Sequence, residues 1–324
     1  MGLRGARVCV TIVTRAVIGQ APRLIAVLAV AGGLALLPGG SAAGGQPSSP
    51  AASAAHLLRP ESALFYKGSI YVTQMGTALS FRGDSAPDGS IAVVDATGKV
   101  LRTLAAGLTD PTGMAVVGST LWVNDVNQIR SFDLTTGAAG AARDLSASVA
   151  ADSFLNDLAA DRAGQLWTTE SFTSRIHLVR TDGSVATFTL PKEYAFPNGI
   201  AVHPTANQVW FMTTATGGGA ALARITPTGY ALVRRSSDFA GLDGLVFVRR
   251  KLAVKTKAGK MRVRLVVEAV FSDSVTDKIW KLSGGKLTLR ATLPGAPADI
   301  GYSAALGRLL VPLLESGEFT TIKP

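Results

Sequence analysis

The sequence predicts an all-β fold, a six-bladed β-propeller with four-stranded blades around a central channel. A short phrase recurs six times along the chain, and the second position of each copy carries a side chain with an oxygen atom. Successive copies of this position are 51, 44, 42, 45 and 56 residues apart, a spacing typical of propeller blades. The positions are Glu61, Thr112, Asn156, Asn198, Asp243 and Asp299.

The N-terminal segment, residues 1–43, is typical of a secretory signal peptide. Four arginines precede or border an apolar run at residues 24–37, and small residues follow at 41–43. The alternative is a retained membrane anchor, but the run is shorter than the ~20 residues that a spanning helix needs. We therefore expect cleavage and a secreted or periplasmic protein with no stable membrane span. Residues 44–55, rich in Gly, Pro, Ser and Ala, are expected to form a flexible linker.

Residues 56–324 are expected to form one propeller domain. The chain's single cysteine, Cys9, lies in the leader, so the domain has neither a disulfide nor thiol chemistry. Runs of Val, Ile, Leu and aromatic residues between Gly, Asp, Asn and Pro turns predict the strands, and no sustained helical periodicity occurs. The second to fourth repeats predict strands at 113–117, 121–125, 129–133, 141–145, 158–161, 165–169, 175–179, 185–188, 199–202, 209–212 and 223–225.

The last two repeats are less regular. The fifth holds a basic insertion, residues 249–264, before predicted strands at 269–273 and 278–282. The sixth has predicted strands at 303–304, 308–311 and 319–322 and is then one strand short. Because a closed ring leaves no open sheet edge, we expect residues 55–59 to supply the missing strand.

The recurring oxygen-bearing positions predict a metal site. They start the innermost strand of each blade, which lines the channel, so Glu61, Asn156, Asn198 and Asp243 would meet at one mouth. Oxygen ligands without sulfur or imidazole favour Ca²⁺, Mg²⁺ or Mn²⁺. The alternative is that these side chains only bind strand ends and channel water. Thr112 is expected to face a substrate, and Asp299 to line the channel or support the ligands.

Several of these phrases resemble the SMP-30/gluconolactonase/LRE family, which is related to paraoxonase, diisopropylfluorophosphatase and strictosidine-synthase-like propellers. The resemblance covers residues 56–324 and implies a six-bladed propeller with a catalytic divalent cation, usually Ca²⁺, with Mg²⁺, Mn²⁺ and Zn²⁺ as alternatives. It is carried by Pro60-Glu61, Phe154-Leu155-Asn156-Asp157, Phe196-Pro197-Asn198-Gly199-Ile200 and Gly241-Leu242-Asp243-Gly244-Leu245.

The resemblance also implies roles for single residues. Glu61, Asn198 and Asp243 match the family's metal ligands, and Asn156 matches an Asn that contacts metal or substrate. Asp243 also matches the proposed general base or nucleophile. Two positions depart from the pattern: Phe154 stands where sugar lactonases carry Arg, and Thr112 stands where paraoxonases carry His. We therefore expect Asn156, Thr112 and Phe154 to form an unfamiliar substrate-binding surface.

These observations predict a monomeric, exported, metal-dependent hydrolase of a lactone or similar small ester. The alternative is a non-catalytic propeller whose cation is structural and which binds a small ligand or a cell-envelope partner. The formal net charge is +10, of which the leader arginines supply four. Segment 249–264 holds much of the rest; it is interpreted as a solvated protruding hairpin, or else as a patch for a polyanion.

Other classes of site are not supported by the sequence. It contains no nucleophilic Gly-x-Ser-x-Gly elbow, phosphate-binding glycine loop or Cys/His metal spacing, and no nucleic-acid-binding motif accompanies the basic segment. His177 and His203 belong to no ligand cluster. Acidic or amide residues near the ends of the second strands are expected to fix turns; these are Asn124, Asp125, Glu170 and Asp273.

Overall fold

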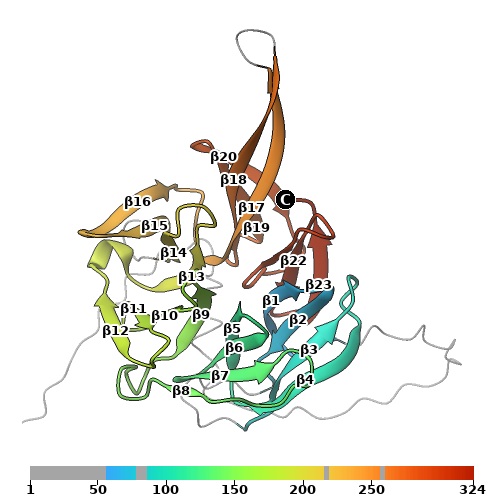
Figure 1. The fold of residues 1–324 in the computed structure, drawn as a ribbon, viewed down its shortest axis with the longest axis vertical. Helices are drawn as coiled ribbons and strands as arrows, with labels where there is room; N and C mark the ends of the chain where they lie inside the picture. Colours follow the sequence, from blue (N-terminus) through green and yellow to red (C-terminus); the bar gives the residue numbers. More distant parts are fainter. Residues whose placement is uncertain (1–55, 78–85, 215–218, 256–259) are drawn as a thin grey trace, which may run out of the picture. The chain divides into compact units, whose positions relative to one another are not determined.

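The computed structural model describes residues 56–77, 86–214, 219–255 and 260–324. These residues form six antiparallel β-sheets, or blades, around a central channel (Figure 1). The all-β propeller prediction is therefore confirmed. The predicted leader and linker, residues 1–55, lie outside the described residues and stay predictions. Within the described residues, none of the helices has the length and apolar character needed to cross a membrane.

The first three blades each have four strands, ordered along the sheet as they follow in sequence. Blade one contains β1 (Pro60–Tyr66), β2 (Ser69–Gln74), β3 (Gly89–Val94) and β4 (Val100–Leu108). Blade two contains β5 (Pro111–Val117), β6 (Thr120–Asp125), β7 (Gln128–Asp133) and β8 (Arg143–Asp144). Blade three contains β9 (Leu155–Ala160), β10 (Leu166–Glu170), β11 (Arg175–Val179) and β12 (Val185–Thr189).

The last three blades follow a short 3₁₀ helix, η2 (Lys192–Tyr194). Blade four contains β13 (Pro197–Val202), β14 (Val209–Thr213), β15 (Ala221–Thr226) and β16 (Gly229–Arg235). Blade five contains β17 (Leu242–Lys255), β18 (Met261–Asp273), β19 (Lys278–Ser283) and β20 (Lys286–Thr292). Blade six contains β21 (Gly301–Ser303), β22 (Arg308–Leu313) and β23 (Glu318–Ile322).

The first strand of each blade lies innermost, and these six strands form a closed ring. β5 lies beside β1 and β9, β13 lies beside β9 and β17, and β21 lies beside β17 and β1. Between blades six and one, Ser62 and Asp299 form a parallel bridge, and the Asp299 N–H donates to the Glu61 carbonyl at 2.9 Å. The recurring positions of blades one to five thus lie at the start of the inner strands, and Asp299 lies just before β21.

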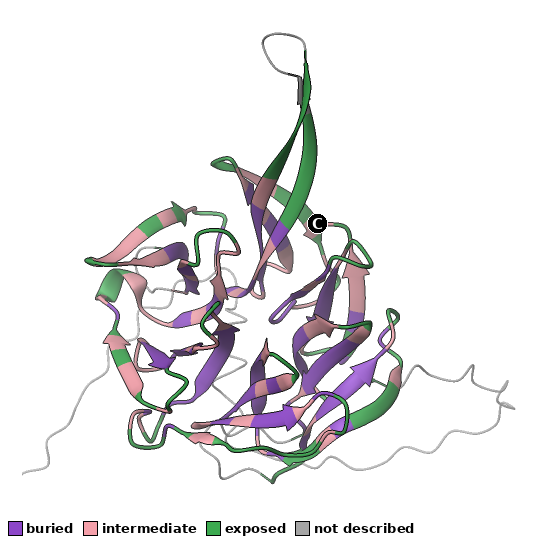
Figure 2. Ribbon diagram, viewed as in Figure 1, coloured by how far each residue is buried: buried purple, intermediate pink, exposed green. Residues whose placement is uncertain are grey.

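The hydrophobic core is divided among the blade interfaces. Each of six buried clusters draws residues from two neighbouring blades, including the pair formed by blades six and one. In blade two, Leu121 and Val123 of β6 point into one such cluster, as the alternation of a strand requires. Figure 2 shows buried residues concentrated in the inner strands and exposure at the outer edges. The buried apolar side chains therefore lie between neighbouring blades and hold them together around the central channel.

The sixth blade differs from the prediction: residues 56–59 of the predicted segment do not form a strand, and the described part of the chain gives this blade three strands. The backbone of this segment is paired mainly with blade one: Met75 and Gly76 donate N–H groups to the carbonyls of Arg59 and Leu58. Leu57 alone donates its backbone N–H to blade six, to Gly317 at 2.9 Å. Its side chain is 3% exposed and packs between blades six and one. Leu57 thus contributes a backbone hydrogen bond and a buried side chain to the junction of blades six and one.

The basic segment extends the first hairpin of blade five, as predicted. β17 and β18 pair in register from Leu245 and Phe271 outward to Lys255 and Met261. Figures 1 and 2 show this hairpin projecting from blade five, with its outer part exposed. Because β19 pairs with β18 only over Ala269–Asp273, the outer part is a free two-stranded ribbon.

Candidate functional site

A local irregularity at the start of the inner strands aims the recurring side chains. In blades one to five the pairing register shifts immediately around the recurring position, for example between Pro60 and Ala63. Such bulges change the direction of a side chain relative to a regular strand. The phrase seen in the sequence is therefore the signature of a bulged strand start.

Hydroxyl groups from the second strand fix the bulges and join neighbouring blades. Thr169 of β10 accepts the Asp157 N–H at 3.0 Å and donates to the Asn198 carbonyl of the next blade at 2.8 Å. Ser272 of β18 accepts the Gly244 N–H at 2.7 Å and donates to the Ala298 carbonyl at 2.8 Å. At these two junctions the inner strand is therefore held by contacts within its own blade and with the neighbouring one.

The acidic residues that end the second strands have the turn-fixing role predicted for them. Asp125 accepts the N–H groups of Thr109 and Asp110, and Asp273 accepts those of Ala240 and Gly241. These bonds anchor the chain just before the inner strand of the same blade.

Glu170 has the same role in blade three. It accepts the Ala150 N–H and pairs with the fully buried His177 at 2.8 Å, while the other ring nitrogen of His177 lies 2.9 Å from Thr187. Burial raises the pKa of Glu170, but hydrogen bonds from His177, Thr173 and others outweigh it, lowering the pKa to about 2. His177 is thus a satisfied core residue of blade three.

Glu61 and Asp243 are two of the four predicted metal ligands. Glu61 is 6% exposed, and its Oε2 atom is buried with no hydrogen-bond partner in the described part of the chain. Burial, and then the charges of Asp299, Asp243 and Asp157, raise the pKa of Glu61 well above its ordinary value. Burial and the charge of Asp299 raise the pKa of Asp243 to about 7, against a hydrogen bond from Ser274. The two acids therefore lie close enough to influence each other.

The two predicted asparagine ligands differ in how they are held. Asn156 is 8% exposed and donates from Nδ2 to the Ser171 hydroxyl at 2.9 Å, which orients its amide. Asn198 has a buried Oδ1 atom without a hydrogen-bond partner among the described residues. An unpaired amide oxygen in a buried position is costly, so this atom, like Glu61 Oε2, is available for a ligand.

The predicted substrate-binding residues are largely enclosed. Thr112 is fully buried, and its hydroxyl donates to the Leu155 carbonyl at 2.9 Å. Phe154 is 6% exposed and packs edge to face against Phe172 at 5.2 Å, and Phe172 in turn contacts Phe196. In this conformation the Thr112 hydroxyl is engaged with the next blade, and the roles of Thr112 and Phe154 toward a substrate stay predictions.

The structure adds Asp157, which the sequence reasoning did not assign. Asp157 and Asp299 come from blades three and six, and the charge of Asp157 adds to burial in raising the pKa of Asp299. Asp157 also accepts the N–H groups of Ile200 and Leu158, and the Ser62 hydroxyl donates to Asp299 at 2.5 Å.

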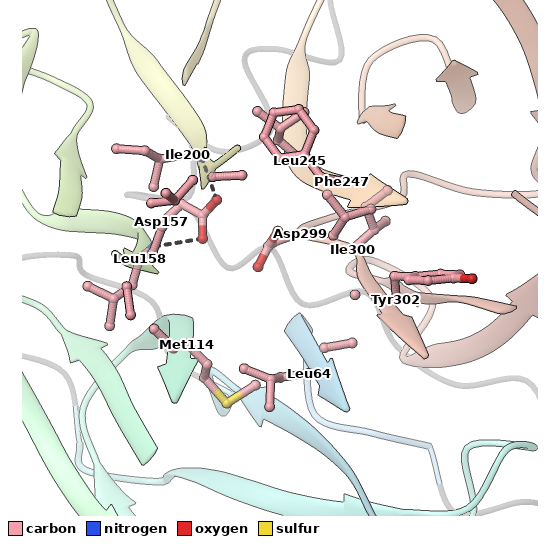
Figure 3. A pocket seen from close by; sticks show the side chains of 18 of the residues that line it. Leu64, Met114, Asp157, Leu158, Ile200, Leu245, Phe247, Asp299, Ile300 and Tyr302 are labelled. Atoms are coloured by element: carbon pink, nitrogen blue, oxygen red, sulfur yellow. Dashed lines mark hydrogen bonds between the residues drawn. The ribbon is translucent and has the colours of Figure 1, made fainter. Parts of the chain in front are cut away.

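These two carboxyl groups lie in the wall of a channel pocket of about 380 Å³ (Figure 3). The rest of the wall is mainly apolar and comes from the inner strands of all six blades, including Leu64, Met114, Leu158, Ile200, Leu245, Phe247, Ile300 and Tyr302. Burial raises the pKa of Asp157 to about 7 and raises that of Asp299 well above its ordinary value. The expectation that Asp299 lines the channel is confirmed.

The channel residues fit a hard cation in their chemistry. Glu61 Oε2 and Asn198 Oδ1 are buried oxygens without partners, and the charges of Glu61 and Asp243 influence one another. In the conformation described, however, no group of three or more His, Cys, Asp or Glu side chains among the described residues is arranged to hold a metal ion. A site would therefore combine carboxylate with amide oxygens.

Comparison with solved structures gives propellers of low sequence identity. Streptogramin B lyase is 16% identical, with 82% of this chain and 93% of that chain covered and a TM-score of 0.54. A provisionally assigned gluconolactonase is 13% identical, with 82% and 89% covered and a TM-score of 0.56. Hydrazine synthase of Kuenenia stuttgartiensis is 10% identical, with 86% and 99% covered and a TM-score of 0.56. These likenesses establish the fold alone.

No protein-family profile and no characterised protein sequence matches the chain. The expected relation to gluconolactonase-type propellers is therefore supported at the level of the fold. The finer assignment of activity, metal and export depends on this chain's own residues.

Proposed function

We propose that this propeller is a metal-dependent hydrolase of a lactone or similar small ester, with a divalent cation held by Glu61, Asn156, Asn198 and Asp243. The observation that supports this proposal most strongly is the concentration of acidic groups in the channel. Burial, together with the charges of neighbouring channel acids, raises the pKa values of Glu61, Asp157, Asp243 and Asp299. No ion pair found in the described residues involves any of the four. A cation would relieve this repulsion.

The predicted ligands suit Ca²⁺ best. The two carboxylates would balance the charge of a divalent ion, and the amide oxygens are ligands that Ca²⁺ accepts. When bound, the cation would supply polarisation of a substrate carbonyl and stabilisation of the developing oxyanion. The unpaired atoms of Glu61 and Asn198 support their assignment as ligands.

The chain's own residues would handle the proton and the substrate. A carboxyl group with a pKa near 7, such as Asp243, can accept a proton from water at neutral pH. A carboxylate bound to a cation is a poor base, and Asp157 and Asp299 are then the neighbouring carboxyl groups placed to take that role. The aromatic residues Phe154, Phe172 and Phe196 would exclude water beside Asn156.

The alternative function is a non-catalytic propeller that binds a small ligand around a structural cation. The enclosed Thr112 hydroxyl favours it, because that group is bonded to backbone where a catalytic side chain would face the substrate. Among the fold neighbours, a chain of the nidogen/laminin complex is 13% identical with a TM-score of 0.53. The propeller fold thus accompanies binding as well as catalysis.

The test is hydrolysis of a panel of lactones and aryl esters, with Ca²⁺ or with a chelator. We expect Ca²⁺-dependent turnover that Asp243→Asn lowers by about 10²- to 10⁴-fold if Asp243 is the base. The Ca²⁺ affinity of the variant is measured separately, because loss of both turnover and Ca²⁺ affinity would identify Asp243 as a ligand. Asp182→Asn, in an exposed turn, is the control and should match wild type. Metal-dependent melting with no turnover on any substrate would favour the binding protein.

A further inference from the structure

The outer part of the blade-five hairpin is a distinct surface, which we name the arm: residues 249–253 of β17 and 261–267 of β18. Nine large hydrophobic side chains are exposed in the described residues, and four of them lie on this short ribbon. They are Leu252 at 40%, Met261 at 63%, Val263 at 70% and Leu265 at 49% exposure. Exposed apolar groups concentrated in one element indicate an interaction surface.

The same segment is strongly basic. Residues 249–267 contain eight Lys or Arg residues and no Asp or Glu. At the base of the arm, Glu268 pairs with Arg250 and with Lys281 of β19, at 3.7 and 3.6 Å. Arg249, Lys251, Arg262 and Arg264 are exposed and have no acidic neighbour within the segment. The arm therefore presents positive charge and apolar surface together.

The strand register separates these groups between two faces. Successive side chains of a strand point to opposite faces, and paired residues share a face. Lys251 is paired with Leu265, and Ala253 with Val263, so the stripe Met261, Val263 and Leu265 lies on the same face as Lys251. Arg262 and Arg264 lie on the other face with Leu252. One face thus has an apolar stripe flanked by a basic row.

We propose that the arm docks the propeller onto an anionic lipid surface. Met261, Val263 and Leu265 would enter the boundary between headgroups and acyl chains, where amphipathic elements bury their apolar face. Arg249 and Lys251 would reach lipid phosphates from the same face, since long basic side chains extend toward charge while their stems stay on apolar surface. Arg262 and Arg264 would add long-range attraction.

A lipid surface explains the arm better than a soluble polyanion does. Positive charge alone would suffice to bind a soluble polyanion. The exposed apolar stripe would then serve no purpose and would favour aggregation. Single-stranded nucleic acids are bound through aromatic stacking, and residues 249–267 contain no aromatic residue. This inference does not depend on the proposed enzymatic activity, because the arm projects away from the channel (Figure 1).

The first test is flotation of the full chain with vesicles of phosphatidylcholine, with and without one third phosphatidylglycerol. We expect binding to the anionic vesicles and at least about tenfold weaker partitioning for Arg262→Glu/Arg264→Glu, since each basic residue near the surface contributes to the attraction. Arg102→Glu/Arg234→Glu, on the exposed outer strands β4 and β16, is the charge-matched control. All variants keep the same N-terminal segment, so its own lipid affinity is common to them.

The second test asks whether the stripe enters the lipid. In a Cys9→Ser background, Val263→Cys carries an environment-sensitive dye, and Leu101→Cys on β4, 61% exposed, serves as the control. Anionic vesicles should shift the emission of the dye at position 263 to the blue and leave that at 101 unchanged.

Three results would overturn the proposal. One is equal binding by wild type and the arm double variant. Another is binding to soluble polyphosphate that competes with vesicles and leaves the dye unshifted, which would identify a polyanion site. A third is a change of sedimentation coefficient in the arm variants without any change in vesicle binding, which would identify contact with a second copy of the chain.

Discussion

At the scale of single residues, polar side chains near the channel divide into those that bind the backbone and those that have no partner. Thr169 and Ser272 each satisfy one N–H group and one carbonyl group at a blade junction. Glu61 Oε2 and Asn198 Oδ1 satisfy none in the described residues. The first class stabilises the fold, whereas the second costs stability and is explained by a ligand.

A matched pair of threonines tests this division. Thr169→Val removes a hydroxyl that serves the Asp157 N–H and the Asn198 carbonyl, and each buried group left unpaired costs about 1–3 kcal/mol. Thr213→Val removes a fully buried hydroxyl without a partner in the described residues, so its effect should be neutral or stabilising. Urea unfolding of both variants checks this. Equal destabilisation of the two proteins would contradict the assignment.

The candidate site could be predicted from the sequence where its residues recur in register. The same position of the first, third, fourth and fifth repeats holds Glu61, Asn156, Asn198 and Asp243. This recurrence predicted that all four lie on inner strands. Asp157 was missed because its position holds glycine in three other blades. The partners of Thr112 and Asn156 were missed because they belong to the next blade or to the next strand, and a single repeat does not reveal them.

At the scale of elements, the close approach of neighbouring inner strands depends on glycines in the bulges. A Cβ atom on Gly244 would lie 2.2 Å from the Ile300 N atom, and one on Gly199 would lie 1.9 Å from the Asp243 carbonyl oxygen. These are backbone atoms of the next blade, and they cannot move aside without moving the strand. In the sequence these glycines resemble ordinary turn residues, but in the structure they set the spacing between blades.

Replacement of such a glycine should therefore separate two blades. Gly244→Ala is expected to destabilise the protein by about 1–3 kcal/mol or more, as overpacking of a tight contact does. Gly295→Ala, where a Cβ atom would meet nothing within 4 Å, is the control and should change little. The unfolding temperatures of the two variants measure this difference. An unfolding temperature of Gly244→Ala equal to that of wild type would contradict this interpretation.

The strands could be predicted where buried residues alternate clearly, and most of them were. β11 and β18 were predicted well at their inner ends, whereas β16 (Gly229–Arg235) was not assigned because its residues are mostly half-buried or exposed. The missing strand of blade six was placed wrongly. Sequence reasoning required a closed edge, and in the structure Leu57 contributes a backbone hydrogen bond and a buried side chain at this junction.

At the scale of the whole molecule, stability is distributed over six blade interfaces around an acidic channel. Burial and the charges of neighbouring acids raise the pKa values of Asp157 and Asp243 to about 7, and those of Glu61 and Asp299 are raised as well. In the unfolded chain these groups titrate near pH ~4. The folded protein therefore binds more protons than the unfolded chain between these values.

The sign of the pH dependence follows from that difference. Without a cation, the free energy of unfolding should fall as pH rises from about 4 to 7, because the channel acids are then forced to ionise. Glu170, with its pKa lowered to about 2, acts in the opposite direction, and its contribution is lost only as pH falls through that value. Urea unfolding at pH 5 and pH 8 in chelator checks the prediction, and greater stability at pH 8 would contradict it.

The most direct test of the central claim, a cation held by the channel oxygens, is the unfolding temperature at pH 8 measured with Ca²⁺ and with a chelator, for wild type and Glu61→Gln. Binding to the folded state alone stabilises a protein by about 2.7 kcal/mol at a ligand concentration of one hundred times Kd. We predict that Ca²⁺ raises the wild-type unfolding temperature at pH 8, raises it less at pH 5, and has little effect on Glu61→Gln. An unchanged wild-type unfolding temperature at pH 8, with saturating Ca²⁺, Mg²⁺ or Mn²⁺, would contradict the account.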